Sequence, residues 1–206
     1  MEKMTPTNTA FNLKKIVRKN IQNLKAYSSA RDEFTGNEGI FLDANENPYG
    51  TLNRYPDPYQ KDLKNALGKR KNIPTKNIFI GNGSDEIIDL LFRIFCKPGK
   101  DKALTFSPTY GMYDVSAAIN DVELLTIPLD ENFQIDTEKT LPFLQNEQLK
   151  LVFICSPNNP TGNILKADSI RFILENFKGI VVIDEAYIDF SETVSWVEFI
   201  GKYPNL

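Results

Sequence analysis

The sequence predicts an α/β fold of three layers, α/β/α, in which helices cover both faces of a mostly parallel sheet. Three observations predict it. Short apolar runs alternate along residues 57–206 with longer segments whose apolar residues recur at helical spacing. The runs are continuously apolar, which is typical of parallel strands buried on both faces. With 206 residues, of which 41% are hydrophobic and 25% charged, the chain has the composition of a globular protein with a sizeable core.

The elements follow one another in regular order. Helices are expected at 56–70, 84–96, 109–119, 136–146 and 167–177, and strands at 77–80, 102–106, 122–129, 151–155 and 180–184. Asp57 is expected to cap the first helix, with Pro58 at its first position. Asp85 and Glu86 stand in the first turn of the second helix, where the helix dipole favours negative charge. A last helix is expected at 196–202.

The chain is predicted to have two parts. Residues 1–50 are expected to form an N-terminal arm and part of a small domain. They include an amphipathic stretch at 11–24 and a segment rich in turn formers at 45–50. Residues 51–206 are expected to form a large domain that is truncated, and therefore incomplete, at its C-terminus.

Composition excludes several classes of function. The formal net charge of −3 gives no basic surface for nucleic acid. No apolar run reaches the length of a membrane span and the N-terminus lacks the apolar core of a signal peptide, so a cytoplasmic location is expected. Cys96 and Cys155 stand in apolar runs and are expected to be buried free thiols. The absence of histidine excludes Ser-His and Cys-His nucleophiles and most zinc sites.

In parallel α/β sheets, ligands bind beyond the carboxyl ends of the strands. The turn at residues 81–86, GNGSDE, follows one predicted strand and opens a helix. Its glycine amides could approach a phosphate at the helix N-terminus. The alternative is a simple capping turn, in which Ser84 or Asp85 satisfies the first amides.

Two further turns follow predicted strands. Tyr110, in the segment SPTYGMY, could stack on a flat ring or could be a packing residue. The segment SPNNPTG at 156–162 would hold an asparagine amide rigidly at the mouth of the sheet, although a purely structural turn would account for it as well.

Asp184 directly follows a hydrophobic strand and should lie in the ligand crevice. It could bind a metal ion together with Glu185, as in nucleotide hydrolases, or pair with a cationic ring nitrogen. The P-loop that usually accompanies the metal site is absent.

In this order, the segments GNGSDE, SPTYGMY, SPNNPTGN and VVIDEAYIDF resemble those of the fold-type I aminotransferases that depend on pyridoxal 5'-phosphate (PLP). Within that family they are similar to the histidinol-phosphate aminotransferases of histidine biosynthesis, and LDANENPYG and NRYPDP resemble that subfamily's upstream segments. The resemblance covers about residues 12–206. It implies transfer of an amino group between glutamate and imidazole acetol phosphate by a cytoplasmic homodimer.

The resemblance also implies a role for each motif. Gly83, Ser84 and Asp85 would bind the cofactor phosphate, Asp85 mainly through its backbone, and Tyr110 would stack on the pyridine ring. Asn159 and Tyr187 would contact the ring's phenolic oxygen, and Asp184 would pair with the pyridine nitrogen. Tyr55 would reach the phosphate bound by the neighbouring subunit. The amino-acid substrate would lie near Asn45, Asn47 and Tyr49. Asp184 and Tyr187 are the expected catalytic residues, and no metal is expected.

One feature of the family is missing. The family binds PLP covalently through a lysine in a Ser/Thr-x-Ser-Lys-type turn, and no such turn follows Asp184. Lys202, the last lysine, stands in the segment GKYPNL, which is typical of a helix end. We therefore expect the printed chain to be a fragment without transaminase activity.

Alternatives to this function remain open. One is a related PLP enzyme, such as an aromatic aminotransferase or a threonine-phosphate decarboxylase. Another is a non-catalytic PLP-fold remnant that acts as a binding module. The last is a metal-dependent phosphoryl-transfer protein that uses Asp184 and Glu185.

Overall fold

A computed structural model describes residues 11–28, 38–40, 42, 45, 47, 49–50 and 57–206. The chain divides into two compact units, one within Met1–Gln22 and Gly81–Leu206 and a smaller one within Asn23–Ile80. The predicted division at residue 50 stays a prediction.

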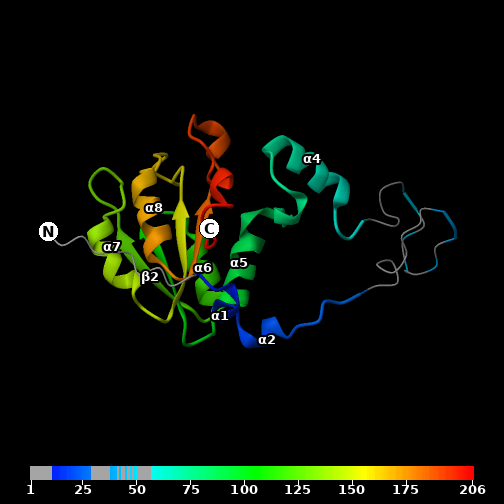
Figure 1. Cartoon of the computed structure of the whole chain (residues 1–206), viewed down its shortest axis with the longest axis horizontal. Coiled ribbons are helices and arrows are strands. Elements are labelled where there is room, and N and C mark those ends of the chain that lie inside the picture. The colour runs from blue at the N-terminus through cyan, green and yellow to red at the C-terminus, as the bar shows by residue number, and fades with distance from the viewer. Residues whose placement is uncertain are drawn as a thin grey trace. The chain divides into compact units, whose positions relative to one another are not determined.

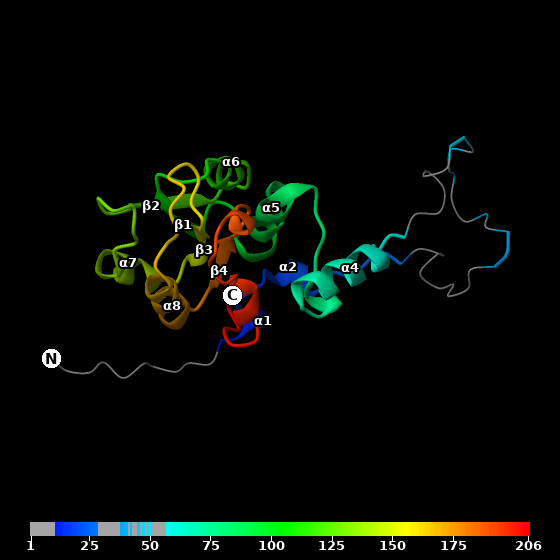
Figure 2. The same ribbon diagram turned by 90° about the horizontal axis from the view of Figure 1, so that it is seen from above.

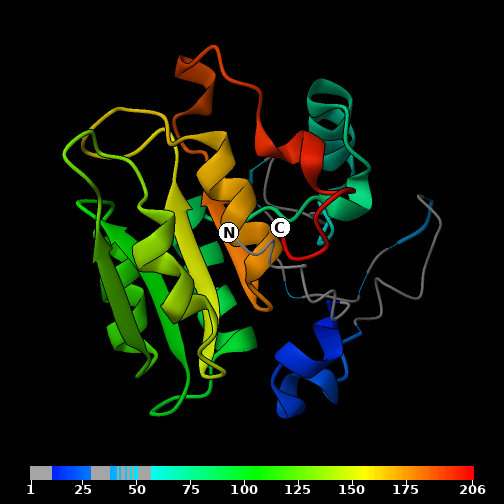
Figure 3. The same cartoon turned by 60° about the vertical axis from the view of Figure 1, so that its left-hand side comes forward.

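The larger unit is built on a parallel sheet of four strands. In chain order these are β1 (Lys102–Ser107), β2 (Glu123–Pro128), β3 (Leu149–Cys155) and β4 (Ile180–Asp184). Their order across the sheet is β2-β1-β3-β4, and every neighbouring pair is parallel (Figure 3). Parallel neighbours need a crossover segment between them, and helices provide these crossovers here. The carboxyl ends of all four strands therefore meet at one edge.

Helices cover both faces of the sheet. They are α5 (Gly83–Phe95), α6 (Met112–Ile119), α7 (Thr137–Leu144) and α8 (Ala167–Asn176). Figure 2 shows α5 and α6 on one side of the row of strands and α7 and α8 on the other. Alternate residues of β3 point to opposite faces, so Val152 and Ile154 pack with α7 and α8, whereas Leu151 and Phe153 pack with α5 and α6. The predicted three-layer α/β class is confirmed.

The N-terminal stretch packs on this unit as two short helices rather than one amphipathic segment. They are α1 (Leu13–Ile16) and α2 (Lys19–Gln22), visible in Figure 1. Ile16 and Val17 join the core beside α5. The Arg18 N–H donates to the carbonyl of Ile94, and its guanidinium donates to the carbonyl of Arg93.

The first predicted helix starts later than expected. In the smaller unit, α4 spans Lys61–Lys71, and the short 3-10 helix η1 spans Thr75–Asn77. Gln60 adopts a left-handed conformation with φ 48°, which breaks the helix before Lys61. Pro58 is therefore not the first helical residue, although the Asp57 carboxylate accepts from the N–H groups of Tyr59 and Lys61.

Two other predicted elements were wrong. Residues 78–80 form no strand, and no strand of the described chain pairs with them. A strand exists only through its hydrogen-bonded partner, so an apolar run by itself is insufficient. The expected helix at 196–202 is reduced to the 3-10 helix η3 (Trp196–Phe199), which follows η2 (Ile188–Phe190).

The last residues of the chain lie along β4. The carbonyl of Asn205 accepts from the N–H of Val181, and its side-chain amide donates to the carbonyls of Leu174 and Phe177 at the end of α8. Asn205 thus ties the C-terminal segment to both β4 and α8. Cys96 and Cys155 are buried free thiols, as predicted, and burial raises the pKa of Cys96 to about 12. Within the described part of the chain, no helix is both long and apolar enough to cross a membrane.

Candidate functional site

The polar residues that follow the strands gather at the carboxyl edge of the sheet. Tyr110 follows β1, Asn159 follows β3, and Asp184 ends β4, while the N-terminus of α5 belongs to the same unit. Hydrogen bonds join Tyr110 to the first turn of α5 and Tyr113 of α6 to Asp184. Parallel topology brings them together, because it directs every strand's carboxyl end to the same edge.

Both carboxylate oxygens of Asp184 are held by donors. Oδ2 accepts from the hydroxyl of Tyr113 at 2.8 Å, and Oδ1 accepts from the N–H of Ala186 at 3.0 Å. The backbone carbonyl of Asp184 accepts from the N–H of Ser156, which joins the ends of β3 and β4. Asp184 as a whole is half-buried.

Tyr110 connects the end of β1 to the first turn of α5. Its hydroxyl donates to Oδ1 of Asp85 at 3.1 Å, and its ring lies edge-on to that of Tyr113 with centroids 5.7 Å apart. The hydrogen bond to Asp85 raises the pKa of Tyr110, with smaller contributions in the same direction from Asp184 and Tyr187. Tyr110, Asp85, Asp184 and Tyr187 therefore share one neighbourhood.

The N-terminus of α5 has an open approach. Gly83 has φ +74°, and a Cβ built on it would meet nothing within 4 Å. No side chain of Asn82 caps the helix; instead Glu86 reaches back and accepts from the N–H of Asn82. The alternative in which Ser84 or Asp85 caps the first amides is thus not observed. The N–H of Gly83 donates to the carbonyl of Gly81, whereas no side chain of the described residues accepts from the N–H groups of Ser84 and Asp85. Amides without an acceptor at the start of a helix of 13 residues favour an anion.

The turn after β3 is organised by Asn158, which the sequence did not single out. Asn158 is 3% exposed. Its amide donates to the carbonyl of Pro108 and to Oγ1 of Thr161, and its Oδ1 accepts from the hydroxyl of Thr109. The side chain therefore ties the loop after β1 to the loop after β3. Its neighbour Asn159 is half-buried, and the side chain of Asn159 makes no hydrogen bond to the described residues.

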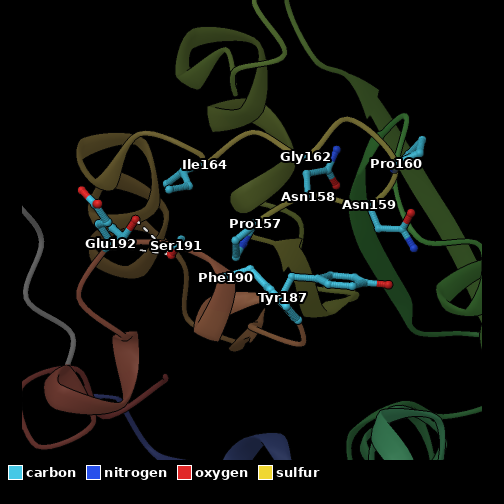
Figure 4. A pocket seen from close by; sticks show the side chains of 11 residues that line it. Pro157, Asn158, Asn159, Pro160, Gly162, Ile164, Tyr187, Phe190, Ser191 and Glu192 are labelled. Carbon is cyan, nitrogen blue, oxygen red and sulfur yellow. Dashed lines mark hydrogen bonds between the residues drawn. The ribbon is translucent and has the colours of Figure 1, made fainter.

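A pocket of about 840 Å³ opens beside Asn159 and Tyr187. Figure 4 shows the ring of Tyr187 extending toward the side on which Asn159 lies, with Phe190 next to it. Tyr187 is 46% exposed and Phe190 is 87% exposed, so the wall they form is apolar and open to solvent. Asp184 and Tyr110 do not line this pocket. Asn158 and Tyr187 are among the residues that line it.

Glu185 has a structural task of its own. Its carboxylate accepts from the hydroxyl of Ser195 and from the N–H of Trp196, so it caps η3. This leaves Asp184 without the second carboxylate that metal binding by this pair requires. In the residues that the structure describes, no three histidine, cysteine, aspartate or glutamate side chains lie together as metal ligands.

The remaining predicted site residues belong to the smaller unit. The side chain of Asn47 accepts from the N–H of Tyr49, and Tyr49 is exposed. Asn45 is also exposed. Tyr55 lies outside the described residues.

Tyr113 is the second residue that sequence reasoning missed. It stands three residues after Tyr110 in SPTYGMY, where helical spacing identifies it only as a core residue of α6. Its hydrogen bond to Asp184 depends on the sheet, which brings together residues 71 positions apart.

This fold defines a three-layer α/β protein with a group of polar and aromatic side chains at the carboxyl edge of a parallel sheet. The model of one family, described as aminotransferase class I and II, matches residues 31–206. The chain belongs to that family.

Relatives and solved structures agree with the family. The chain is 55% identical over 202 residues to histidinol-phosphate aminotransferase of Cytophaga hutchinsonii, which covers 96% of this chain and 58% of the relative. The crystal structure of histidinol-phosphate aminotransferase from Clostridium acetobutylicum matches 74% of this chain and 45% of that chain, with a TM-score of 0.63 and 30% identity. The enzyme from Sinorhizobium meliloti, in complex with PLP, matches 74% of this chain and 42% of that chain, with a TM-score of 0.65 and 25% identity. The chain therefore spans little more than half the length of the curated relative.

Proposed function

We propose that residues 1–206 form the cofactor-binding part of a histidinol-phosphate aminotransferase that uses PLP. One observation carries the proposal: the groups gathered at the carboxyl edge of the sheet match PLP chemically, group by group. The name of the 55% identical relative and the PLP complex of the Sinorhizobium meliloti enzyme support it.

The phosphate and the ring fit the residues present. The amides of Ser84 and Asp85 stand at a helix N-terminus without a side-chain cap, and the open space beside the Cα of Gly83 lets a phosphate approach them, although the N–H of Gly83 itself donates to the carbonyl of Gly81. The carboxylate of Asp85 is engaged by the hydroxyl of Tyr110, so its backbone is the part that serves the phosphate. Tyr110 provides an aromatic face beside this helix end, on which a pyridine ring stacks.

The polar atoms of the ring also fit. Asp184 is a half-buried residue whose carboxylate would pair with a protonated pyridine nitrogen. Asn159 and Tyr187 are partly exposed donors without a competing hydrogen bond in the described residues, and they would donate to the phenolic oxygen. When bound, PLP supplies a protonated ring that withdraws electrons from the substrate's α-carbon. Asp184 would keep the ring nitrogen protonated, and Tyr110 would hold the ring in place.

The substrate and the assembly are part of the proposal. Asn45, Asn47 and Tyr49 contact the amino-acid substrate, and Tyr55 reaches the cofactor phosphate of a second subunit, so the working enzyme is a homodimer in the cytoplasm. The motifs LDANENPYG and NRYPDP support this part through their resemblance to the family. The substrates are glutamate and imidazole acetol phosphate.

The proposed activity belongs to a protein of the relatives' full length. No Ser/Thr-x-Ser-Lys-type turn follows Asp184 in the printed residues, and the family's chemistry needs that lysine. A chimera tests the activity: residues 1–206 are joined to the C-terminal part of the Cytophaga hutchinsonii relative, at the end of the 202-residue match.

The chimera is assayed with histidinol phosphate and 2-oxoglutarate, and separately with phosphothreonine. We expect glutamate to form from the first pair and no decarboxylation of the second substrate. The variant Asp184→Ala in the same chimera should still bind PLP but lose most turnover. Unchanged turnover in that variant contradicts the role of Asp184, and decarboxylation of phosphothreonine favours the alternative enzyme.

A further inference from the structure

Tyr113 is a tyrosine without exposed surface whose hydroxyl donates to Oδ2 of Asp184 at 2.8 Å. We propose that Tyr113 is a positioning residue of the cofactor site, which fixes the Asp184 carboxylate in the orientation that pairs with the pyridine nitrogen. This inference rests on the proposed function. It assigns a role to a residue that contacts Asp184 rather than the cofactor.

The carboxylate of Asp184 is fixed from two elements. Ala186 holds Oδ1 through its backbone in the turn after β4, and Tyr113 holds Oδ2 from α6. With both donors in place, rotation about the Cβ–Cγ bond breaks at least one hydrogen bond. Hydrogen bonds to a charged acceptor are among the stronger ones in proteins, so the carboxylate is oriented before any ligand arrives.

Tyr113 is itself immobile. Its ring stacks on Phe153 of β3, with centroids 4.9 Å apart and an interplanar angle of 19°. The ring of Tyr110 makes a T-shaped contact with it, with centroids 5.7 Å apart. Burial, and next the charge of Asp184, raise the pKa of Tyr113 well above its usual range, so the hydroxyl keeps its proton and stays a donor at neutral pH.

The ring and the hydroxyl of Tyr113 have separate roles. The ring supports Tyr110, the proposed stacking partner of the cofactor, whereas the hydroxyl reaches Asp184. Tyr113→Phe removes only the hydroxyl and keeps the packing on Phe153, so the variant should fold. Tyr203→Phe is the matched control, since Tyr203 is 6% exposed in the same unit and its buried hydroxyl has no partner in the described residues.

The probe is pyridoxamine 5'-phosphate, whose amine does not condense with lysines, and calorimetry measures its binding to the 206-residue chain. Tyr113→Phe should weaken binding about five- to tenfold, because a mobile carboxylate has to be ordered on binding. Tyr203→Phe should leave the affinity unchanged. With a ¹⁵N-labelled probe, the pyridine nitrogen should show the protonated chemical shift in the unaltered chain and move toward the unprotonated value in Tyr113→Phe.

A double-mutant cycle with Asp184→Ala separates positioning from packing. In the Asp184→Ala background, Tyr113→Phe should cause no further loss of affinity, because the acceptor is gone. An equal loss of affinity in both backgrounds overturns the inference. The inference is also overturned if Tyr113→Phe binds the probe as tightly as the unaltered chain does and gives the same ¹⁵N shift. If the unaltered chain does not bind the probe at all, the proposed function fails and the inference fails with it.

Discussion

The hydroxyl of Tyr110 donates a hydrogen bond of 3.1 Å to Oδ1 of Asp85, which joins the loop after β1 to the first turn of α5. In the proposed site these two segments serve different parts of the cofactor, the ring and the phosphate. The bond therefore sets the spacing between the stacking surface and the phosphate site before the cofactor binds.

This bond predicts a change in the titration of Tyr110. Asp85→Asn removes the charged acceptor, which is the main cause of the raised pKa of Tyr110, and the pKa should fall toward its ordinary value. Ultraviolet difference titration checks this, with Tyr110→Phe identifying the signal of Tyr110. Identical titration curves for Asp85→Asn and the unaltered chain would rule out the bond in solution.

Truncation of Asn158 should lower stability, whereas truncation of Asn159 should weaken cofactor binding. Asn158→Ala leaves the carbonyl of Pro108 and the hydroxyls of Thr109 and Thr161 without their shared partner, and should lower the free energy of unfolding by about 1–3 kcal/mol. Asn159→Ala should change stability by less than about 0.5 kcal/mol but weaken cofactor binding. Urea unfolding and calorimetry measure the two effects. A stable Asn158→Ala variant would contradict the role given to this side chain.

Asn159 and Asn158 illustrate what the sequence could and could not predict. Continuous apolar runs predicted β1, β3 and β4, and with them the places of Tyr110, Asn159 and Asp184, because local pattern and strand-end geometry suffice for that. Residues 78–80 have a similar pattern yet form no strand, since pairing depends on distant residues. Asn158 and Tyr113 were missed for the same reason: Asn158 bonds Thr109, 49 positions away, and Tyr113 bonds Asp184, 71 positions away.

Glu185 should matter for stability and not for cofactor binding. Its carboxylate caps η3 through Ser195 and Trp196, so Glu185→Ala should cost about 1 kcal/mol of folding free energy. Glu198→Ala, which removes an exposed carboxylate from the same 3-10 helix, is the control and should be neutral. Loss of pyridoxamine 5'-phosphate binding in Glu185→Ala would instead place Glu185 in the ligand site.

The raised pKa of Tyr113 predicts a loss of stability at high pH. This pKa lies above the value of about 10 for an unfolded tyrosine, so the contribution of Tyr113 to the free energy of unfolding is fully present below about pH 10. As the pH rises further, the unfolded state loses the proton first, and stability should fall by up to about 1.4 kcal/mol per pH unit. Urea unfolding from pH 8 to 11 should show a shallower decline in Tyr113→Phe. Equal slopes would mean that Tyr113 titrates alike in both states.

Binding of the cofactor at the carboxyl edge of the sheet is tested most directly by ¹H–¹⁵N NMR of the chain with and without pyridoxamine 5'-phosphate. We expect the largest shifts on the amides of Gly83, Ser84, Asp85, Tyr110, Asn159, Asp184 and Tyr187. Shifts confined to other residues, or none at saturating cofactor, would contradict binding at this edge.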